Sequence, residues 1–120
     1  MINNGTISSN GGYGHKNGGN KVTGGGSGGS IWITTSVLSG TGSMTANGGN
    51  SGNDILDGGG GSGGRIALYY VEDNSSFTSL TAGGGKPEGD RVVLQYGGAG
   101  TIYKKDTDAG GNGSLIIDNN

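Results

Sequence analysis

The sequence contains no cysteine and a single proline, and charged residues make up only 13% of its 120 positions. Without cysteine the chain can form neither a disulfide framework nor a thiolate site. Its formal net charge of −2, with seven scattered Lys and Arg, argues against nucleic acid as a partner. No apolar run approaches the ~20 residues of a transmembrane helix, so we predict no membrane span.

Apolar residues are scarce as well, at 28%, whereas glycine supplies 32 positions. Ordering glycine costs more backbone entropy than ordering other residues, and so thin a core cannot offset that cost through side chains alone. A folded state therefore needs dense backbone hydrogen bonding, in stacked sheets or in packed polyglycine-type helices. Long amphipathic helices are excluded, because no glycine-free stretch has an apolar 3.6-residue period. Without a repeat, the same composition would indicate a disordered chain.

Two motifs recur along the chain with one shared period of about 36 residues. The first is a short strand-like segment, and the second is a glycine run followed by alternating apolar residues. The first is anchored at Ile7, Met44, Leu80 and Leu115, and the second at Ile31, Ile66 and Ile102. Two motifs with a common period favour a repeat architecture over disorder. We predict a single repeat domain, 1–120, with units at approximately 5–41, 42–77 and 78–112 and a partial unit at 113–120.

Each unit holds three strand-like segments separated by turns rich in glycine and asparagine, which suits one coil of a parallel β-helix. We therefore predict an all-β fold, a parallel β-helix (β-solenoid) of about three coils. Its inward ladders would be Ile7–Met44–Leu80–Leu115 and Ile31–Ile66–Ile102. The alternative is a sandwich of polyglycine II helices, which requires glycine at every third position over long runs. Because β-branched clusters interrupt the glycine runs, we prefer the β-helix, with local polyglycine-like packing in the turns.

No catalytic residue is predicted, and we expect the chain not to be an enzyme. Its serines lie in Gly/Ser turns, and the single histidine, His15, has no partner at a recognisable spacing. The segment 52–59 resembles one calcium-binding nonapeptide, with Asp54 and Asp57 as candidate ligands. Calcium needs six to eight oxygens, and the residues that follow are not acidic. We therefore predict a turn there, with no metal and no cofactor.

Trp32, Tyr69 and Tyr103 alternate with the apolar residues that we place inside, so they would point outward from successive coils. An outward aromatic ladder can pack against a turn or a neighbouring molecule, and it can also stack on the rings of a glycan. We rank packing ahead of ligand binding.

The segments GGGSGGSIWI, LSGTGSMTANGG and GGGGSGGRIALYY resemble the glycine-rich tandem repeats of very large secreted bacterial and archaeal surface proteins. The resemblance implies a β-helical adhesin or stalk at the cell surface or outside the cell, and it brings no catalytic residues. Neither end of the array shows an obvious cap, and uncapped repeats tend to stack. We therefore expect copies to stack head to tail into a fibre, or to form part of a longer stalk. The alternative is an adhesin module that binds a glycan or a surface through its outward aromatics.

Overall fold

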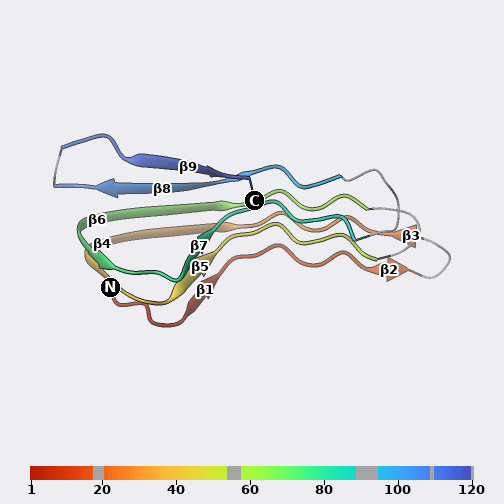
Figure 1. The fold of residues 1–120 in the computed structure, drawn as a ribbon, viewed down its shortest axis with the longest axis horizontal. Helices are drawn as coiled ribbons and strands as arrows, with labels where there is room; N and C mark the ends of the chain where they lie inside the picture. Colours follow the sequence, from red (N-terminus) through yellow and green to blue (C-terminus); the bar gives the residue numbers. More distant parts are fainter. Residues whose placement is uncertain (18–20, 54–57, 89–94, 109, 120) are drawn as a thin grey trace.

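A computed structural model of the chain describes residues 1–17, 21–53, 58–88, 95–108 and 110–119. The regular structure in these residues is β-strand, which confirms the predicted all-β class. The molecule is elongated, with principal extents of 56 × 26 × 17 Å, and most strands lie in two sheets (Figure 1). The described part of the chain contains no helix with the length and apolarity needed to cross a membrane.

The smaller of the two, the short sheet, is parallel and contains β1 (Thr6–Ser8), β5 (Ser43–Thr45) and β7 (Ser79–Thr81), in that order. Its register aligns Ile7 with Met44 and Met44 with Leu80. The long sheet contains β4 (Ser30–Gly40), β6 (Arg65–Ser75), β8 (Gly100–Asp106) and β9 (Ser114–Asp118). Strands β4, β6 and β8 are parallel, with Ile31, Ile66 and Ile102 in register, whereas β9 is antiparallel to β8.

The chain alternates between the two sheets, and we call each visit to both sheets a pass. Pass 1 contains β1 and β4, pass 2 contains β5 and β6, and pass 3 contains β7 and β8. Between its two strands, each pass has one glycine-rich segment that runs toward the far end of the molecule and a second that runs back from it (Figure 1). In pass 1, a small antiparallel hairpin of β2 (Lys16–Asn17) and β3 (Lys21–Val22) lies at that far end.

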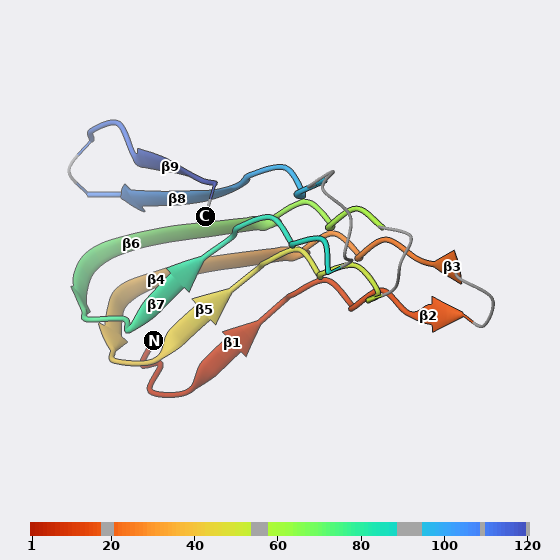
Figure 2. The ribbon, with the colours of Figure 1, turned by 45° about the vertical axis from the view of Figure 1, so that its right-hand side comes forward.

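The apolar core lies between the short and long sheets. Because side chains of a strand alternate between its faces, Ile31, Ile66 and Ile102 share the inner face of the long sheet. These three residues and Met44, which comes from the short sheet, are buried in one cluster. Past this region β4 and β6 curve toward the short sheet (Figure 2). The curve shifts the alternation, so that Leu38 of β4 is buried and Val37 is exposed.

The glycine-rich segments are joined by backbone hydrogen bonds across passes. In neighbouring segments every third residue donates to the next pass: Gly11 and Gly14 donate to the carbonyls of Asn47 and Asn50. A three-residue period is that of a polyglycine II helix. A second series crosses between segments, with each N–H donating to the preceding carbonyl along Gly12, Gly26, Gly49, Gly61, Gly85 and Gly97. The backbone thus supplies the cohesion that the thin apolar core does not.

Glycine is required where these segments meet most closely. A Cβ added to Gly49 would lie 2.0 Å from the carbonyl oxygen of Gly12, and one added to Gly85 would lie 2.0 Å from that of Gly49. In contrast, a Cβ on Gly12 itself, in the first pass, has no atom within 4 Å.

The prediction for Leu115 is wrong. Leu115 does not continue the Ile7–Met44–Leu80 series; it lies in β9, paired with Tyr103 of β8, and its side chain is exposed. The reason is the short link between β8 and β9, which suffices for an antiparallel hairpin but not for a crossover back to the short sheet. Gly110 takes a positive φ of 60° in that link.

Candidate functional site

The first end of the stack of passes has unpaired strand edges in both sheets. Strands β1 and β4 are the outermost strands of their sheets. The N-terminal residues cover only the curved half of β4, where the N–H of Asn3 donates to the carbonyl of Ser39 at 2.9 Å. Among the described residues, no strand pairs with the outer side of β1 or of Ser30–Thr35. We call β1 and Ser30–Thr35 the open end.

The opposite end is closed on the long sheet. There β9 covers the outer edge of β8, so the long sheet has four strands where the short sheet has three (Figure 1). The carboxylate of Asp118 accepts a hydrogen bond from the N–H of Ala82, just after β7, at 2.7 Å. Gly113 lets the link to β9 pass the ring of Tyr103, because a Cβ there would lie 2.3 Å from the ring. We call β7, β8 and β9 together the closed end.

Asparagine side chains link each pass to the next one. Asn10 accepts from the N–H of Asn47 at 2.8 Å, and Asn47 accepts from the N–H of Gly83 at 2.8 Å. Asn50 does the same for the N–H of Lys86, at 2.9 Å. At the equivalent positions pass 3 carries Gly83 and Lys86, neither of which has an amide oxygen in its side chain. The asparagine series therefore ends at the closed end.

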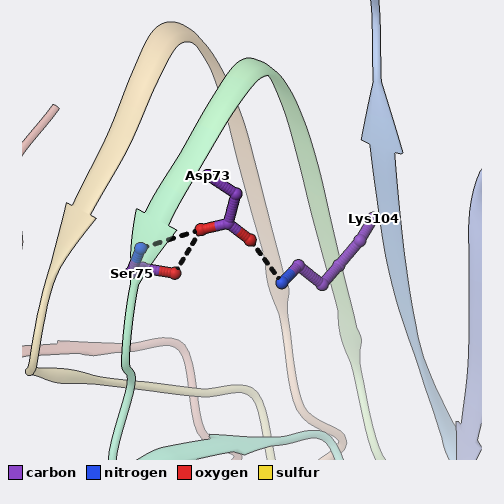
Figure 3. Close-up of polar contacts among 3 residues, drawn as sticks. All are labelled: Asp73, Ser75 and Lys104. Atoms are coloured by element: carbon purple, nitrogen blue, oxygen red, sulfur yellow. Dashed lines mark hydrogen bonds and ion pairs between the residues drawn. The ribbon is translucent and has the colours of Figure 1, made fainter. Parts of the chain in front are cut away.

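The closed end also carries an ion pair. Its cation is Lys104 of β8, which is aligned across the long sheet with the apolar residues Leu68 of β6 and Ile33 of β4. The Lys104 ammonium lies 2.7 Å from the Asp73 carboxylate (Figure 3). Asp73 also accepts from the N–H and the hydroxyl of Ser75. Partial burial by itself would raise the pKa of Asp73, but the hydrogen bonds from Lys104 and Ser75 outweigh it and leave the pKa below its usual value.

A polar contact near the far end ties three passes together. The hydroxyl of Tyr13 donates to the Glu88 carboxylate at 3.0 Å, and the amide of Asn50 donates to both. The pKa of Tyr13 is raised, because the hydrogen bond and the charge of Glu88 both oppose ionisation of the phenol. One residue from each pass takes part, so the contact holds the passes in register and forms no separate site.

The three aromatic residues selected from the sequence do come together, on the outer face of the long sheet. Trp32 and Tyr103 are both in register with Ala67, and Tyr69 lies between their rings, with centroids 4.8 Å and 5.7 Å away. Ala67 is only 3% exposed although it lies on the outer face, which follows from the rings around it. Trp32 belongs to the open end and remains 60% exposed, with the Arg65 guanidinium 6.0 Å from its ring centroid.

The candidate calcium ligands Asp54 and Asp57 lie outside the described residues. Within the described ranges, no three His, Cys, Asp or Glu side chains are grouped so that they could hold a metal ion. His15 lies beside the β2–β3 hairpin, where its backbone N–H donates to the hydroxyl of Thr23 at 2.8 Å.

Sequence reasoning missed the residues that distinguish the two ends. Asp118 and Lys104 are single charged residues outside any motif. The role of Asp118 depends on the reversal of the chain at β9, and that of Lys104 on its ion pair with Asp73 of β6. The end of the asparagine series could have been found, because aligning the units sets Asn10 and Asn47 against Gly83. No protein family, no curated protein and no solved structure matches this chain.

Proposed function

We propose that this chain is a structural β-solenoid module, in which each pass is one coil, and that its open end takes further coils of the same repeat. The observation that carries the proposal is the shared parallel register, which aligns Ile7, Met44 and Leu80 in one sheet and Ile31, Ile66 and Ile102 in the other. A coil that can pair on both sides is a unit of a one-dimensional stack. Backbone edges of this kind attract further strands.

The features of the two ends favour a stack that is extended at the open end. There a preceding coil can pair with both β1 and β4. An asparagine of that coil can accept a hydrogen bond from the N–H of Asn10, just as the Asn10 side chain accepts one from the N–H of Asn47. At the closed end the strand edge of β8 is covered and the asparagine series has ended. Of the two forms expected from the sequence, part of a longer stalk therefore fits better than a uniform head-to-tail fibre.

The resemblance to glycine-rich repeats of secreted surface proteins supports an extracellular or cell-surface location for this module. A stack held by backbone hydrogen bonds is a stiff spacer, and it needs no catalytic residue. The proposed role is mechanical: the coils set the distance between whatever lies at the two ends of the stalk.

The proposal is tested by giving the chain one more coil. A second copy of residues 42–77 is inserted between Phe77 and Thr78, and the control chain receives the same residues in scrambled order. Each added repeat brings a favourable interface with its neighbours, so the chain with the duplicated coil should unfold at a higher temperature than the parent. The proposal fails if the duplicated coil lowers the unfolding temperature as much as the scrambled insertion does.

A second candidate function is glycan binding, favoured by the exposure of Trp32 beside Arg65. Sugar rings stack on exposed aromatic faces, and Trp32 is the only tryptophan, so its fluorescence reports on such binding directly. The test is a fluorescence titration with a panel of oligosaccharides. Saturable quenching that is absent from Tyr69→Ala and preserved in Tyr96→Ala, an exposed tyrosine outside this cluster, would support it. A flat titration with every sugar would exclude it.

A further inference from the structure

Pass 3 is the surface on which the open end of a second copy would stack if the register of the chain were simply continued. Ile7 of the second copy would then follow Leu80 in the short sheet, and its Ile31 would follow Ile102 in the long sheet. Both strands of the open end are already parallel to β7 and β8, so neither sheet would have to change direction.

In the structure, β9 occupies the place that β4 of the second copy would take. It pairs with β8 along Gly100–Lys104 and sets Ile116 beside Ile102. In the short sheet, the Asp118 side chain takes the place of a backbone acceptor that the second copy would supply. The N–H of Ala46 donates to the carbonyl of Thr81 in the next pass, and the equivalent N–H, that of Ala82, donates to the Asp118 carboxylate instead.

We propose that β9 is a cap strand, which covers a docking surface for the open end of a second copy of this chain. The inference rests on the proposed stacking of coils. Because β9 replaces both the β4 strand and the Ser8 carbonyl of an incoming copy, the chain cannot stack head to tail while β9 is in place.

The cap is suited to displacement, because it buries little apolar surface. Leu115, Ile116 and Ile117 are all exposed, and Ile116 is 47% exposed whereas its neighbour Ile102 is 2% exposed. The hydrophobic contribution to holding a strand scales with the apolar area that it removes from water. Pass 3 lacks the asparagine acceptors, and Lys104 stands in place of an apolar residue there. A second copy therefore stacks on pass 3 more weakly than consecutive passes stack within one chain, and its stacking is reversible.

The experiment compares a released cap with a locked cap in the full-length chain. The released variant carries Leu115→Pro, Ile116→Pro and Asp118→Ala. Successive N–H groups of a strand point to opposite sides, so one of the two prolines removes a hydrogen bond to β8. The locked variant carries Thr101→Cys and Ile117→Cys, which are cross-strand partners, and oxidation joins them in a chain that has no other cysteine.

Light scattering over a concentration series gives the concentration at which half of the chains are associated. We expect release of the cap to lower this concentration by about tenfold or more, the change that corresponds to ~1.4 kcal/mol. The oxidised locked variant should stay monomeric throughout. The same protein in its reduced form has a cap that can still be displaced, so it should associate at high concentration, and this comparison holds even if the proline variant does not fold.

Two substitutions in the glycine-rich segments, Gly12→Ala in pass 1 and Gly98→Ser in pass 3, show which surface is used. Gly12 aligns with Gly49 and Gly85, so a Cβ on Gly12 of an incoming copy would meet the carbonyl of Gly85, although it is harmless within one chain. Adding Gly12→Ala to the released variant should therefore abolish association. Gly98→Ser is the matched control, because its Cβ site is free and the equivalent positions already carry Ser27 and Ser62.

The possible results separate the cap from the stacking itself. If the released variant is folded but monomeric at every concentration, the cap inference is overturned, while a stabilising duplicated coil would still support the proposed function. If the oxidised locked variant associates as readily as the released one, or if Gly12→Ala has no effect, association uses another surface and the inference is also overturned. Failure of the duplicated coil alone would remove the stacking on which both proposals rest.

Discussion

The carboxylate of Asp118 and the backbone N–H of Ala82 form a 2.7 Å hydrogen bond that closes one end of the stack. It stands where a further strand would otherwise supply a carbonyl, as Thr81 does for Ala46. The Asp118 side chain of β9 thus accepts a hydrogen bond from an N–H group that would otherwise be unsatisfied at the edge of the short sheet.

Removing the Asp118 carboxylate should destabilise the chain modestly. Asp118→Ala leaves the N–H of Ala82 without this acceptor, and hydrogen bonds to charged groups contribute about 1.5–3 kcal/mol, less where water can reach. We expect a loss of about 1 kcal/mol in the free energy of unfolding, measured by urea denaturation. Asp118→Asn keeps an acceptor oxygen and should lose less. Equal losses for the two variants would contradict the assigned hydrogen bond.

Alanine should have opposite consequences at two equivalent glycines. Gly49→Ala forces a Cβ to 2.0 Å from the Gly12 carbonyl, and the clash lies between backbones that cannot move independently. Overpacking of this kind costs about 1–3 kcal/mol or more, so Gly49→Ala should unfold at far lower denaturant concentration. Gly12→Ala meets open space and should stay within about 0.5 kcal/mol of the parent. If both are tolerated equally, the glycine segments do not pack as described.

The Asp73–Lys104 pair should make stability depend on acid. Because the pKa of Asp73 is lowered in the folded chain, the unfolded chain binds the proton more readily. The contribution of the ion pair to the free energy of unfolding is therefore fully present above the ordinary aspartate pKa. It is lost as the pH falls through the lowered pKa of Asp73 in the folded chain. Asp73→Asn should flatten this part of the acid limb in urea denaturation between about pH 2 and pH 5. Lys104→Met, which keeps the apolar stem, should shift the remaining titration of Asp73 upward; an unchanged acid limb in both variants would show that the pair is not formed.

Within the aromatic cluster, Tyr69 should matter most for stability. Its ring lies between those of Trp32 and Tyr103, and together the rings cover Ala67. Tyr69→Ala removes both ring contacts, each of which contributes about 0.5–1.5 kcal/mol beyond area burial. We expect a larger loss of thermal stability than for Trp32→Ala, which removes one contact. The opposite order would contradict the central position of the Tyr69 ring in this cluster.

The period of the sequence was enough to predict the class of the fold and most of the register. The anchors of both motifs align in the structure because each apolar residue must return to the same face of a sheet once per pass. Leu115 was misplaced because a sequence motif does not encode the direction in which a strand pairs. That direction was decided by the short link to β8, which permits a hairpin and not a return to the short sheet.

The three-residue packing of the glycine segments was also hidden in the sequence. Glycine is needed only where backbones meet, as at Gly28, whose Cβ would lie 2.3 Å from the carbonyl of Ala46. The position before it in each pass faces outward and carries Ser27, Ser62 or Gly98. Serine at this outward position, together with the asparagines that link the passes, breaks up the glycine runs, so that the period of three does not appear as an unbroken pattern.

The central claim, that consecutive passes pair in parallel one repeat apart, is tested most directly by cross-linking neighbouring strands of the short sheet. The hydroxyls of Thr6 and Ser43 lie 3.1 Å apart on paired residues of β1 and β5, whereas Ser79 lies one strand further, on β7. Mass spectrometry should find an intramolecular disulfide in oxidised Thr6→Cys/Ser43→Cys and none in Thr6→Cys/Ser79→Cys. Absence of the disulfide from the first protein, or equal yields in both, would contradict the parallel stack.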